Sequence, residues 1–206
     1  MGSSNSIVFI VDDDASVREA LGSLIRSVGW CVETFSFAQD FLRRERLNVA
    51  GCVVLDVRLP DLSGLDVQRK LAEARDGLPI IFLTGHADVL MAVSAMKAGA
   101  AEFLTKPFRE QDLLEAVTRA LELDRRSRLQ RTELSAVGAQ FETLTARERE
   151  VVKHIVKGRL NKQVAADLGI SEITVKVHRR HAMEKMAAGS LAELVSKIDR
   201  LGLEAP

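Results

Sequence analysis

Acidic residues stand directly after two short apolar runs of the sequence. The runs cover 7–11 and 52–55, and the acids that follow them are Asp12, Asp13, Asp14 and Asp56. Such runs predict two buried strands of one sheet with carboxylates at their C-terminal ends, which is the edge where open α/β sheets bind ligands. Crowded carboxylates repel one another unless a cation joins them, and hard oxygen ligands suit Mg²⁺. The pattern therefore predicts a magnesium site.

Two further residues with suitable chemistry follow later apolar runs. Thr84 follows the run at 80–83, and Lys106 follows the run at 102–105 and precedes Pro107. Since cis peptide bonds are largely confined to X–Pro, Pro107 favours a cis bond that points the Lys106 ammonium inward. An acid pair, a lone aspartate, a threonine and a Lys-Pro pair thus stand at the ends of successive expected strands.

Apolar runs alternate with amphipathic stretches as far as about residue 123. The expected strands cover 7–11, 31–35, 52–55, 80–83 and 102–105. The expected helices cover 15–28, 38–45, 64–74 and 88–98, with a last one from 110 onward. Five βα units of this length predict an α/β fold, in which helices cover both faces of a doubly wound, five-stranded parallel sheet.

This order of residues at strand ends resembles the receiver domain of bacterial two-component response regulators, which has a flavodoxin-like fold. The resemblance implies that Asp56 accepts a phosphoryl group from a sensor histidine kinase and forms an acyl phosphate. It also implies that Asp13, Asp56 and the backbone carbonyl of Arg58 bind Mg²⁺, while Asp12 acts largely through water. Asp14 is an additional acid without a direct role in this scheme.

The same resemblance identifies residues that respond to the phosphoryl group. Thr84 and Lys106 are expected to bind its oxygens through a hydroxyl and a point charge. Phe103 occupies the usual aromatic switch position; it has no hydroxyl, so its movement must depend on packing and on Thr84. The segment Thr84-Gly85-His86 resembles the FixJ-type branch, in which His86 either modulates phosphoryl access or faces solvent without a role.

A long helical pattern continues beyond the last expected strand. We expect the receiver over 1–123, followed by a linker over 124–141 that prolongs the last receiver helix and ends near 135–138. A disordered linker is the alternative.

The sequence over 142–206 has an all-helical pattern and forms the expected second domain. A capping box at 145–148 opens a helix over 146–157. Three further helices, ending near residues 168, 186 and 201, are expected to be capped by Asn161, Ser171 and Ser190. Four short helices with glycine-marked turns predict an all-α helix-turn-helix domain.

Residues 144–203 resemble the LuxR-type helix-turn-helix of FixJ and NarL regulators, most clearly at 144–151 and 174–178. On a helix from 172, Lys176, Val177 and Arg180 share one face. In the major groove of double-stranded DNA, Lys and Arg can contact guanine and Val can touch a thymine methyl. Phosphate contacts are expected from Asn161, Lys162, Thr174 and His181.

The charge distribution agrees with an anionic partner for the C-terminal end. The formal net charge is zero, but residues 1–110 carry −3 and residues 142–206 carry +3. Cys31 and Cys52 stand in apolar contexts, which favours small hydrophobic residues over a disulfide. No apolar run approaches the roughly 20 residues that span a bilayer, and residues 1–6 resemble a flexible leader rather than a signal peptide. We therefore expect a cytoplasmic protein without membrane contact.

These observations predict a phosphorylation-regulated DNA-binding protein. It is not an enzyme in the usual sense, although we expect it to hydrolyse its own acyl phosphate slowly. Phosphorylation is expected to drive homodimerisation through 88–105, where Val93 and Lys97 share a helix face at i, i+4 spacing. Coiled-coil pairing of the long helix over 110–135 is the alternative.

Two rival functions remain at this stage. An orphan regulator would bind DNA without phosphorylation, although its acid set would then have no use. An Asp-nucleophile phosphatase of the haloacid-dehalogenase type requires a second aspartate two residues after the nucleophile, and Arg58 stands there.

Overall fold

The computed structural model describes residues 6–45, 48–74, 76–85 and 89–202. His86 and the expected start of a helix at residue 88 lie outside these ranges. The chain divides into two compact units, Met1–Arg128 and Leu129–Pro206. In the described residues, every helix is too short or too polar to cross a bilayer.

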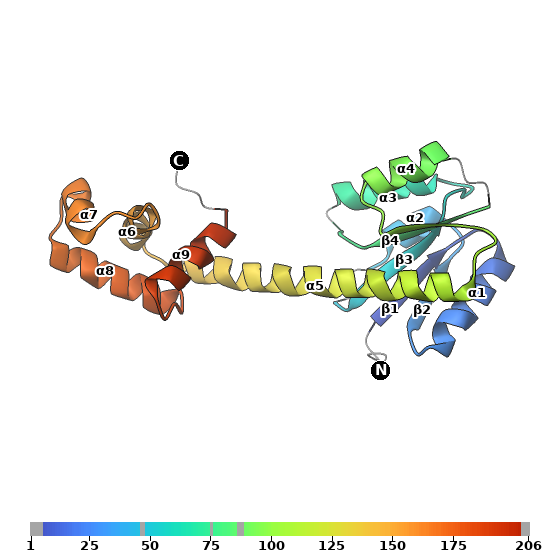
Figure 1. Cartoon of the computed structure of the whole chain (residues 1–206), viewed down its shortest axis with the longest axis horizontal. Coiled ribbons are helices and arrows are strands. Elements are labelled where there is room, and N and C mark those ends of the chain that lie inside the picture. The colour runs from blue at the N-terminus through green and yellow to red at the C-terminus, as the bar shows by residue number, and fades with distance from the viewer. Residues whose placement is uncertain (1–5, 46–47, 75, 86–88, 203–206) are drawn as a thin grey trace. The chain divides into compact units, whose positions relative to one another are not determined.

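The first unit is built on a parallel sheet in the order β2-β1-β3-β4-β5 (Figure 1). Its strands are β1 (Ser6–Val11), β2 (Cys31–Phe35), β3 (Ala50–Asp56), β4 (Ile80–Thr84) and β5 (Glu102–Thr105). The strand order reverses at β1, and the crevice beside such a reversal is where open α/β sheets bind ligands. The predicted doubly wound fold is confirmed.

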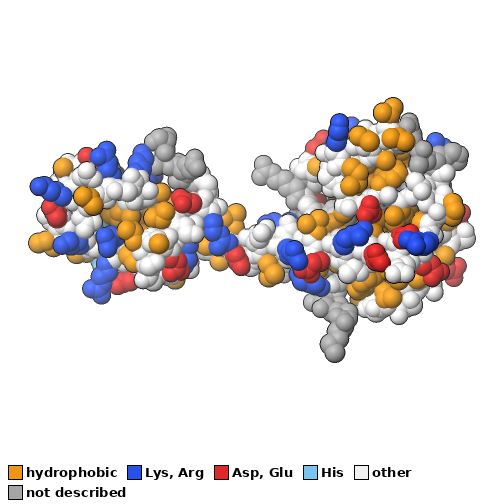
Figure 2. Space-filling view, in the orientation of Figure 1, with side chains coloured by type: hydrophobic (Ala, Val, Ile, Leu, Met, Phe, Trp, Pro, Cys, Tyr) orange, Lys and Arg blue, Asp and Glu red, His pale blue; other side chains and the backbone are white. Residues whose placement is uncertain are grey.

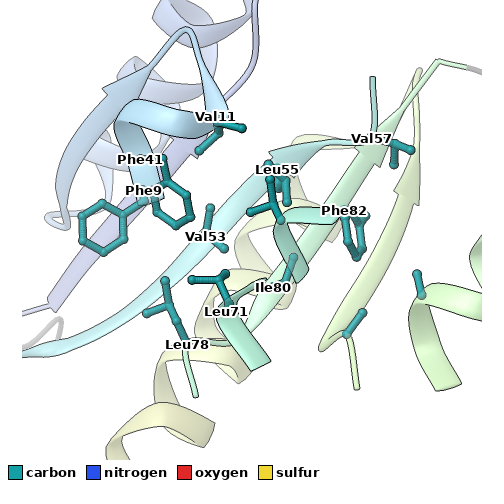
Figure 3. Packing of buried hydrophobic residues seen from close by; sticks show 14 residues of the cluster. Phe9, Val11, Phe41, Val53, Leu55, Val57, Leu71, Leu78, Ile80 and Phe82 are labelled. Carbon is teal, nitrogen blue, oxygen red and sulfur yellow. The ribbon is translucent and has the colours of Figure 1, made fainter. Parts of the chain in front are cut away.

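Helices cover both faces of this sheet. On one face, α2 (Ala38–Arg43), α3 (Gly64–Glu73) and α4 (Val89–Lys97) pack on a buried cluster that includes Phe9, Val53 and Phe82 (Figure 3). On the other face, α1 (Ala15–Ser27) and α5 (Glu110–Glu142) pack on a cluster formed by the alternate strand residues. Because both faces are covered, the central strands β1, β3 and β4 are nearly continuous apolar runs.

Helix α2 begins at a contact that the local sequence does not reveal. The Asp61 carboxylate accepts hydrogen bonds from Ala38 N (3.1 Å) and Gln39 N (2.9 Å). A single residue distant in sequence, Asp61, therefore accepts hydrogen bonds from the first two amides of the helix. The helix ends at Arg43, short of the expected residue 45, and the Arg44 guanidinium packs over the Phe41 ring at 4.1 Å.

Helix α5 is one helix across the segment expected as a linker. It continues to Glu142, so the predicted end near 135–138 is wrong. Val137 is buried and Phe141 packs against the same cluster of the second unit. The packing of these two side chains accounts for the continuation of the helix through Gly138.

The second unit is helical, as predicted. Its remaining helices are α6 (Ala146–Val156), α7 (Asn161–Leu168), α8 (Glu172–Lys185) and α9 (Leu191–Arg200). The capping box at Thr145 and Glu148 is present, and Ser171 and Ser190 cap α8 and α9.

The expected cap of α7 is wrong by one residue. Asn161 is the first helical residue, and Leu160 occupies the capping position. The Gln163 side chain accepts a hydrogen bond from Leu160 N at 2.9 Å, so a glutamine from the first turn satisfies this amide.

Candidate functional site

Three carboxylates meet at the C-terminal edge of the sheet, where β1 and β3 end. Ligand atoms of Asp12, Asp13 and Asp56 all lie within 4.8 Å of one another. Asp12 is buried, Asp56 is partly buried and Asp13 is exposed. The parallel pairing of β1 with β3 brings these acids together, because Val11 is the register partner of Leu55.

One ammonium group joins two of these carboxylates. Lys106 Nζ lies 2.8 Å from Asp12 Oδ2 and 2.9 Å from Asp56 Oδ2. The Lys106–Pro107 bond is cis, as the sequence predicts. The Lys106 ammonium thus contacts two of the three carboxylates, and the hard oxygens of all three suit a divalent cation.

The Lys106 ammonium and the carboxylates of this site affect one another's ionisation. Burial raises the pKa of the Asp12 carboxyl, while the hydrogen bonds from Lys106 and from the Asp14 amide oppose this shift. Burial disfavours the Lys106 ammonium, but the hydrogen bonds to Asp12 and Asp56 nevertheless raise the pKa of that lysine. Lys106 is therefore a permanent positive charge in the site.

Local contacts hold the acid-bearing loop after β1. Arg18 Nη1 donates to the backbone carbonyls of Asp12 (2.7 Å) and Asp13 (2.9 Å). Asp14 caps α1 by accepting from Ser16 N at 2.8 Å. The additional acid is thus a helix cap, and the loop geometry depends on Arg18, a residue the sequence analysis did not single out.

The loop after Asp56 is tightly packed. Arg58 N donates to Asp56 Oδ1 at 2.9 Å, which orients the carboxylate. A Cβ atom on Gly64 would stand 2.7 Å from the Asp56 carbonyl oxygen and 3.0 Å from the Phe82 ring. Only glycine fits this close approach of α3 to the end of β3.

The expected switch residues lie on the neighbouring strands. Thr84 ends β4 and is buried, and its carbonyl accepts from Lys106 N at 2.7 Å. Phe103 is partly buried on β5, with its ring centroid 6.1 Å from that of Phe82. Phe103 lies on β5, which pairs with β4 and leads directly to Lys106, and Lys106 contacts the acids.

The expected dimer residues lie on an apolar face of α4. Val93 is 43% exposed, and Lys97 is also exposed. Three further apolar side chains of α4 are exposed and were not predicted from the sequence, namely Val89, Leu90 and Met96. Hydrophobic side chains gather over this helix in Figure 2.

The expected base contacts share the exposed face of α8. Lys176 and Arg180 are exposed and Val177 is 44% exposed, while Val175 is buried. Ile173 lies one turn before Val177 and is 75% exposed, so this face also carries an apolar residue for which the sequence analysis proposed no contact. Figure 2 shows Lys and Arg side chains at several places on the visible face of the second unit.

The four expected phosphate contacts differ in their surroundings. Lys162 is exposed, and Asn161 is partly buried at the start of α7. The Thr174 hydroxyl lies 2.8 Å from the Ser171 hydroxyl, within the cap of α8. His181 Nδ1 faces the Glu148 carboxylate at 3.9 Å.

Comparison with known proteins identifies both units. Residues 8–118 match the response regulator receiver domain, and residues 142–198 match the bacterial regulatory proteins of the luxR family. The chain is 50% identical to response regulator protein TmoT of Ectopseudomonas mendocina over 201 residues, covering 98% of this chain and 91% of TmoT. It is 41% identical to transcriptional regulatory protein FixJ of Rhizobium meliloti over 188 residues, covering 91% and 92%.

A solved structure extends this similarity to the fold. The low-resolution structure of response regulator StyR matches with a TM-score of 0.84 at 47% identity, covering 95% of this chain and 99% of StyR. A parallel sheet with acids and a lysine at its ligand edge, joined to a helix-turn-helix unit, defines a receiver-controlled DNA-binding protein. The chain belongs to the response regulators with a LuxR-type output domain, and it is a transcription factor rather than a classical enzyme.

Proposed function

We propose that Asp56 accepts a phosphoryl group from a sensor histidine kinase and that this event controls DNA binding. The observation that carries the proposal is the bridge from Lys106 Nζ to Asp12 (2.8 Å) and Asp56 (2.9 Å). The bridging ammonium can follow negative charge from the carboxylate onto a transferred phosphoryl group.

The donor set at the sheet edge fits Mg²⁺. Asp13, Asp56 and the backbone carbonyl of Arg58 would hold the ion, and Asp12 would act largely through water. When bound, Mg²⁺ neutralises charge that develops during phosphoryl transfer.

The transfer step forms one bond to phosphorus and breaks another. An Asp56 oxygen forms a bond to phosphorus while the N–P bond of the kinase phosphohistidine breaks, and its electron pair returns to the imidazole. Lys106 and Thr84 bind the phosphoryl oxygens of the resulting acyl phosphate. Hydrolysis later moves the group to water and restores the carboxylate, so the receiver supplies its own slow dephosphorylation.

The proposed response passes to a homodimer interface on α4. Thr84 moves toward the phosphoryl group, and Phe103 repacks beside Phe82. This movement reshapes the surface of Val93 and Lys97, where a second copy of the chain covers the exposed apolar side chains. Pairing two output units on adjacent half-sites raises their effective concentration on DNA.

The proposed output is sequence-specific binding of promoter DNA. Lys176, Val177 and Arg180 contact base edges in the major groove. The phosphate contacts come from Asn161, Lys162, Thr174 and His181. A regulator with a cytoplasmic kinase domain and chromosomal DNA as partners acts in the cytoplasm.

The main test measures phosphate incorporation in the full-length protein with a small-molecule phosphodonor and Mg²⁺. We expect incorporation in the wild type and none in Asp56→Asn, because an amide of nearly the same shape is no nucleophile. Asp61→Asn is the matched control, since its amide oxygen can still accept from an α2 amide. Stable phosphate in Asp56→Asn would show that another residue is the acceptor. An orphan regulator or an Asp-nucleophile phosphatase would instead carry no stable acyl phosphate on Asp56, even in the wild type.

A second test concerns the dimer. Sedimentation of the free protein and of the protein with beryllofluoride and Mg²⁺ should show a monomer and a dimer. A constant mass in both states would eliminate phosphorylation-driven pairing, and a dimer in both would favour the coiled-coil alternative through α5.

A further inference from the structure

An acidic residue stands on the helix that carries the proposed base contacts. Glu184 lies in the last turn of α8, and its Oε1 accepts a hydrogen bond from Arg180 Nε at 2.8 Å. The side chains are 57% and 79% exposed, respectively. A carboxylate beside a surface for DNA repels phosphates, so its presence there needs a physical reason.

Helix stability does not supply that reason. Negative charge in the last turn opposes the helix macrodipole. An arginine that precedes a glutamate at i, i+4 spacing is in the less favourable order for this dipole. Ion pairs as exposed as Arg180–Glu184 contribute little to folding.

In the described part of the chain, Arg180 is the only cation found to donate a hydrogen bond to Glu184. Lys185 Nζ donates to Glu148 at 2.7 Å, and His181 also faces Glu148. Glu184 is ionised at neutral pH like any ordinary glutamate, and the hydrogen bond from Arg180 lowers its pKa further.

The contact uses only one edge of the Arg180 guanidinium. Glu184 accepts from Nε, and among the described residues this is the only hydrogen bond found for the group. The terminal Nη1 and Nη2 atoms therefore still have donors for a ligand. Guanine presents two acceptors, O6 and N7, to such a planar fork in the major groove.

We propose that Glu184 is a positioning residue that holds the Arg180 fork for a guanine, an inference that rests on the proposed DNA-binding function of α8. Anchoring at Nε restricts the side chain before binding, which reduces the entropy lost on recognition. The carboxylate also disfavours capture of Arg180 by phosphates of unrelated sequences. Lys176 shows no comparable ion pair within the described chain, so we expect the effect to be confined to the base that Arg180 reads.

The test selects binding sites from randomised double-stranded DNA with full-length protein treated with beryllofluoride and Mg²⁺. Arg180→Ala should lose the preference for one guanine that the wild type selects. Glu184→Ala should weaken that preference roughly two- to fivefold, the range of an exposed ion pair, while binding to unrelated DNA tightens. Glu184→Gln should recover part of the preference because its amide oxygen can accept from Nε.

Glu150→Ala is the matched control. Glu150 also pairs with an arginine, Arg147, at 2.6 Å and is 47% exposed, but it lies on α6. This variant removes the same charge and should keep the wild-type guanine preference. Replacement of the selected guanine by 7-deazaguanine, which lacks the N7 acceptor, should weaken the wild type more than Glu184→Ala.

The outcomes separate this inference from the proposed function. If Arg180→Ala keeps the guanine preference, the base contact itself is wrong. If Arg180→Ala loses it and Glu184→Ala keeps it, only the positioning role fails. Equal loss of affinity for all sequences in Glu184→Ala, together with a lower melting temperature, would indicate a structural role and overturn the inference.

Discussion

The two candidate sites of this chain are built in opposite ways. In the receiver, Lys106 contacts acids that lie 94 and 50 positions earlier in the sequence. On α8, the side chains proposed to read bases come from one exposed helical segment, and the contact of Arg180 with Glu184 spans four positions. The first site exists only when β1, β3, β4 and β5 are paired, whereas the second needs one helix held at its buried face.

This difference predicts that substitutions at the two sites affect folding and function differently. The acid site should be lost when the packing beneath it fails, because its geometry is a product of the sheet. The DNA face should tolerate exposed substitutions without loss of folding, because its stability comes from the buried side that includes Val175.

Leu55→Ala should have the largest effect. Leu55 is fully buried beside Asp56, and truncation of a buried leucine costs about 2–5 kcal/mol. We expect lower stability in urea unfolding and reduced phosphorylation. Leu129→Ala, at a side chain 60% exposed on α5, should change stability by less than about 0.5 kcal/mol. Unchanged phosphorylation and stability in Leu55→Ala would refute the dependence of the site on the core.

Glu148→Ala should damage the second unit selectively. The buried carboxylate accepts from Thr145 N at 2.8 Å and from Lys185 Nζ at 2.7 Å, so it joins the start of α6 to α8. Loss of charge-assisted hydrogen bonds costs about 1.5–3 kcal/mol. Calorimetry should show a lower transition for this unit while Asp56 still accepts phosphate. The control, Glu150→Ala on the same helix, should leave that transition in place.

Lys176→Ala should weaken DNA binding without unfolding the protein. A lost base contact costs roughly 1–3 kcal/mol at the specific site, and an exposed helix position carries little stability. In contrast, Lys162→Ala should weaken binding to all sequences alike and lower the salt slope by about one unit. Titrations at several salt concentrations distinguish the two, and identical behaviour would show that the orientation assigned to α8 is wrong.

The pH response of Glu148 should be modest and confined to acid. Burial opposes ionisation, but the hydrogen bonds from Lys185 and Thr145 lower the pKa of Glu148 below its ordinary value. A lowered folded pKa gives stability that is complete above the unfolded pKa of about 4.3 and is lost as pH falls through the folded value. The stability difference between wild type and Glu148→Gln should therefore shrink below about pH 4.3. A difference that grows in acid would contradict this sign.

Asp12 should respond with the opposite sign and the smallest effect. Burial raises the pKa of Asp12, so its contribution is present below the unfolded pKa of about 3.9 and is lost as pH rises through the folded value. In EDTA, the wild type should lose stability relative to Asp12→Asn as pH rises from about 4. Parallel pH profiles for the two proteins would contradict a raised pKa for Asp12.

Much of the receiver site follows from the sequence because it depends on a general rule of parallel sheets. Strand runs that end in Asp12, Asp56, Thr84 and Lys106 place these residues at one edge, whatever the details of packing. The capping box of α6 and the serine caps of α8 and α9 were likewise readable, since they depend on residues within three positions of one another.

Only the tertiary structure decided which residues distant in sequence are in contact and where α5 ends. Asp61 satisfies amides of α2 from 22 and 23 positions away, and Lys106 reaches two acids at once. α5 passes the expected end because Val137 is buried in the second unit and Phe141 packs against the same cluster. Periodicity and capping are local properties of a chain, but a side chain's partner depends on which surfaces pack together, and packing is settled by the whole fold.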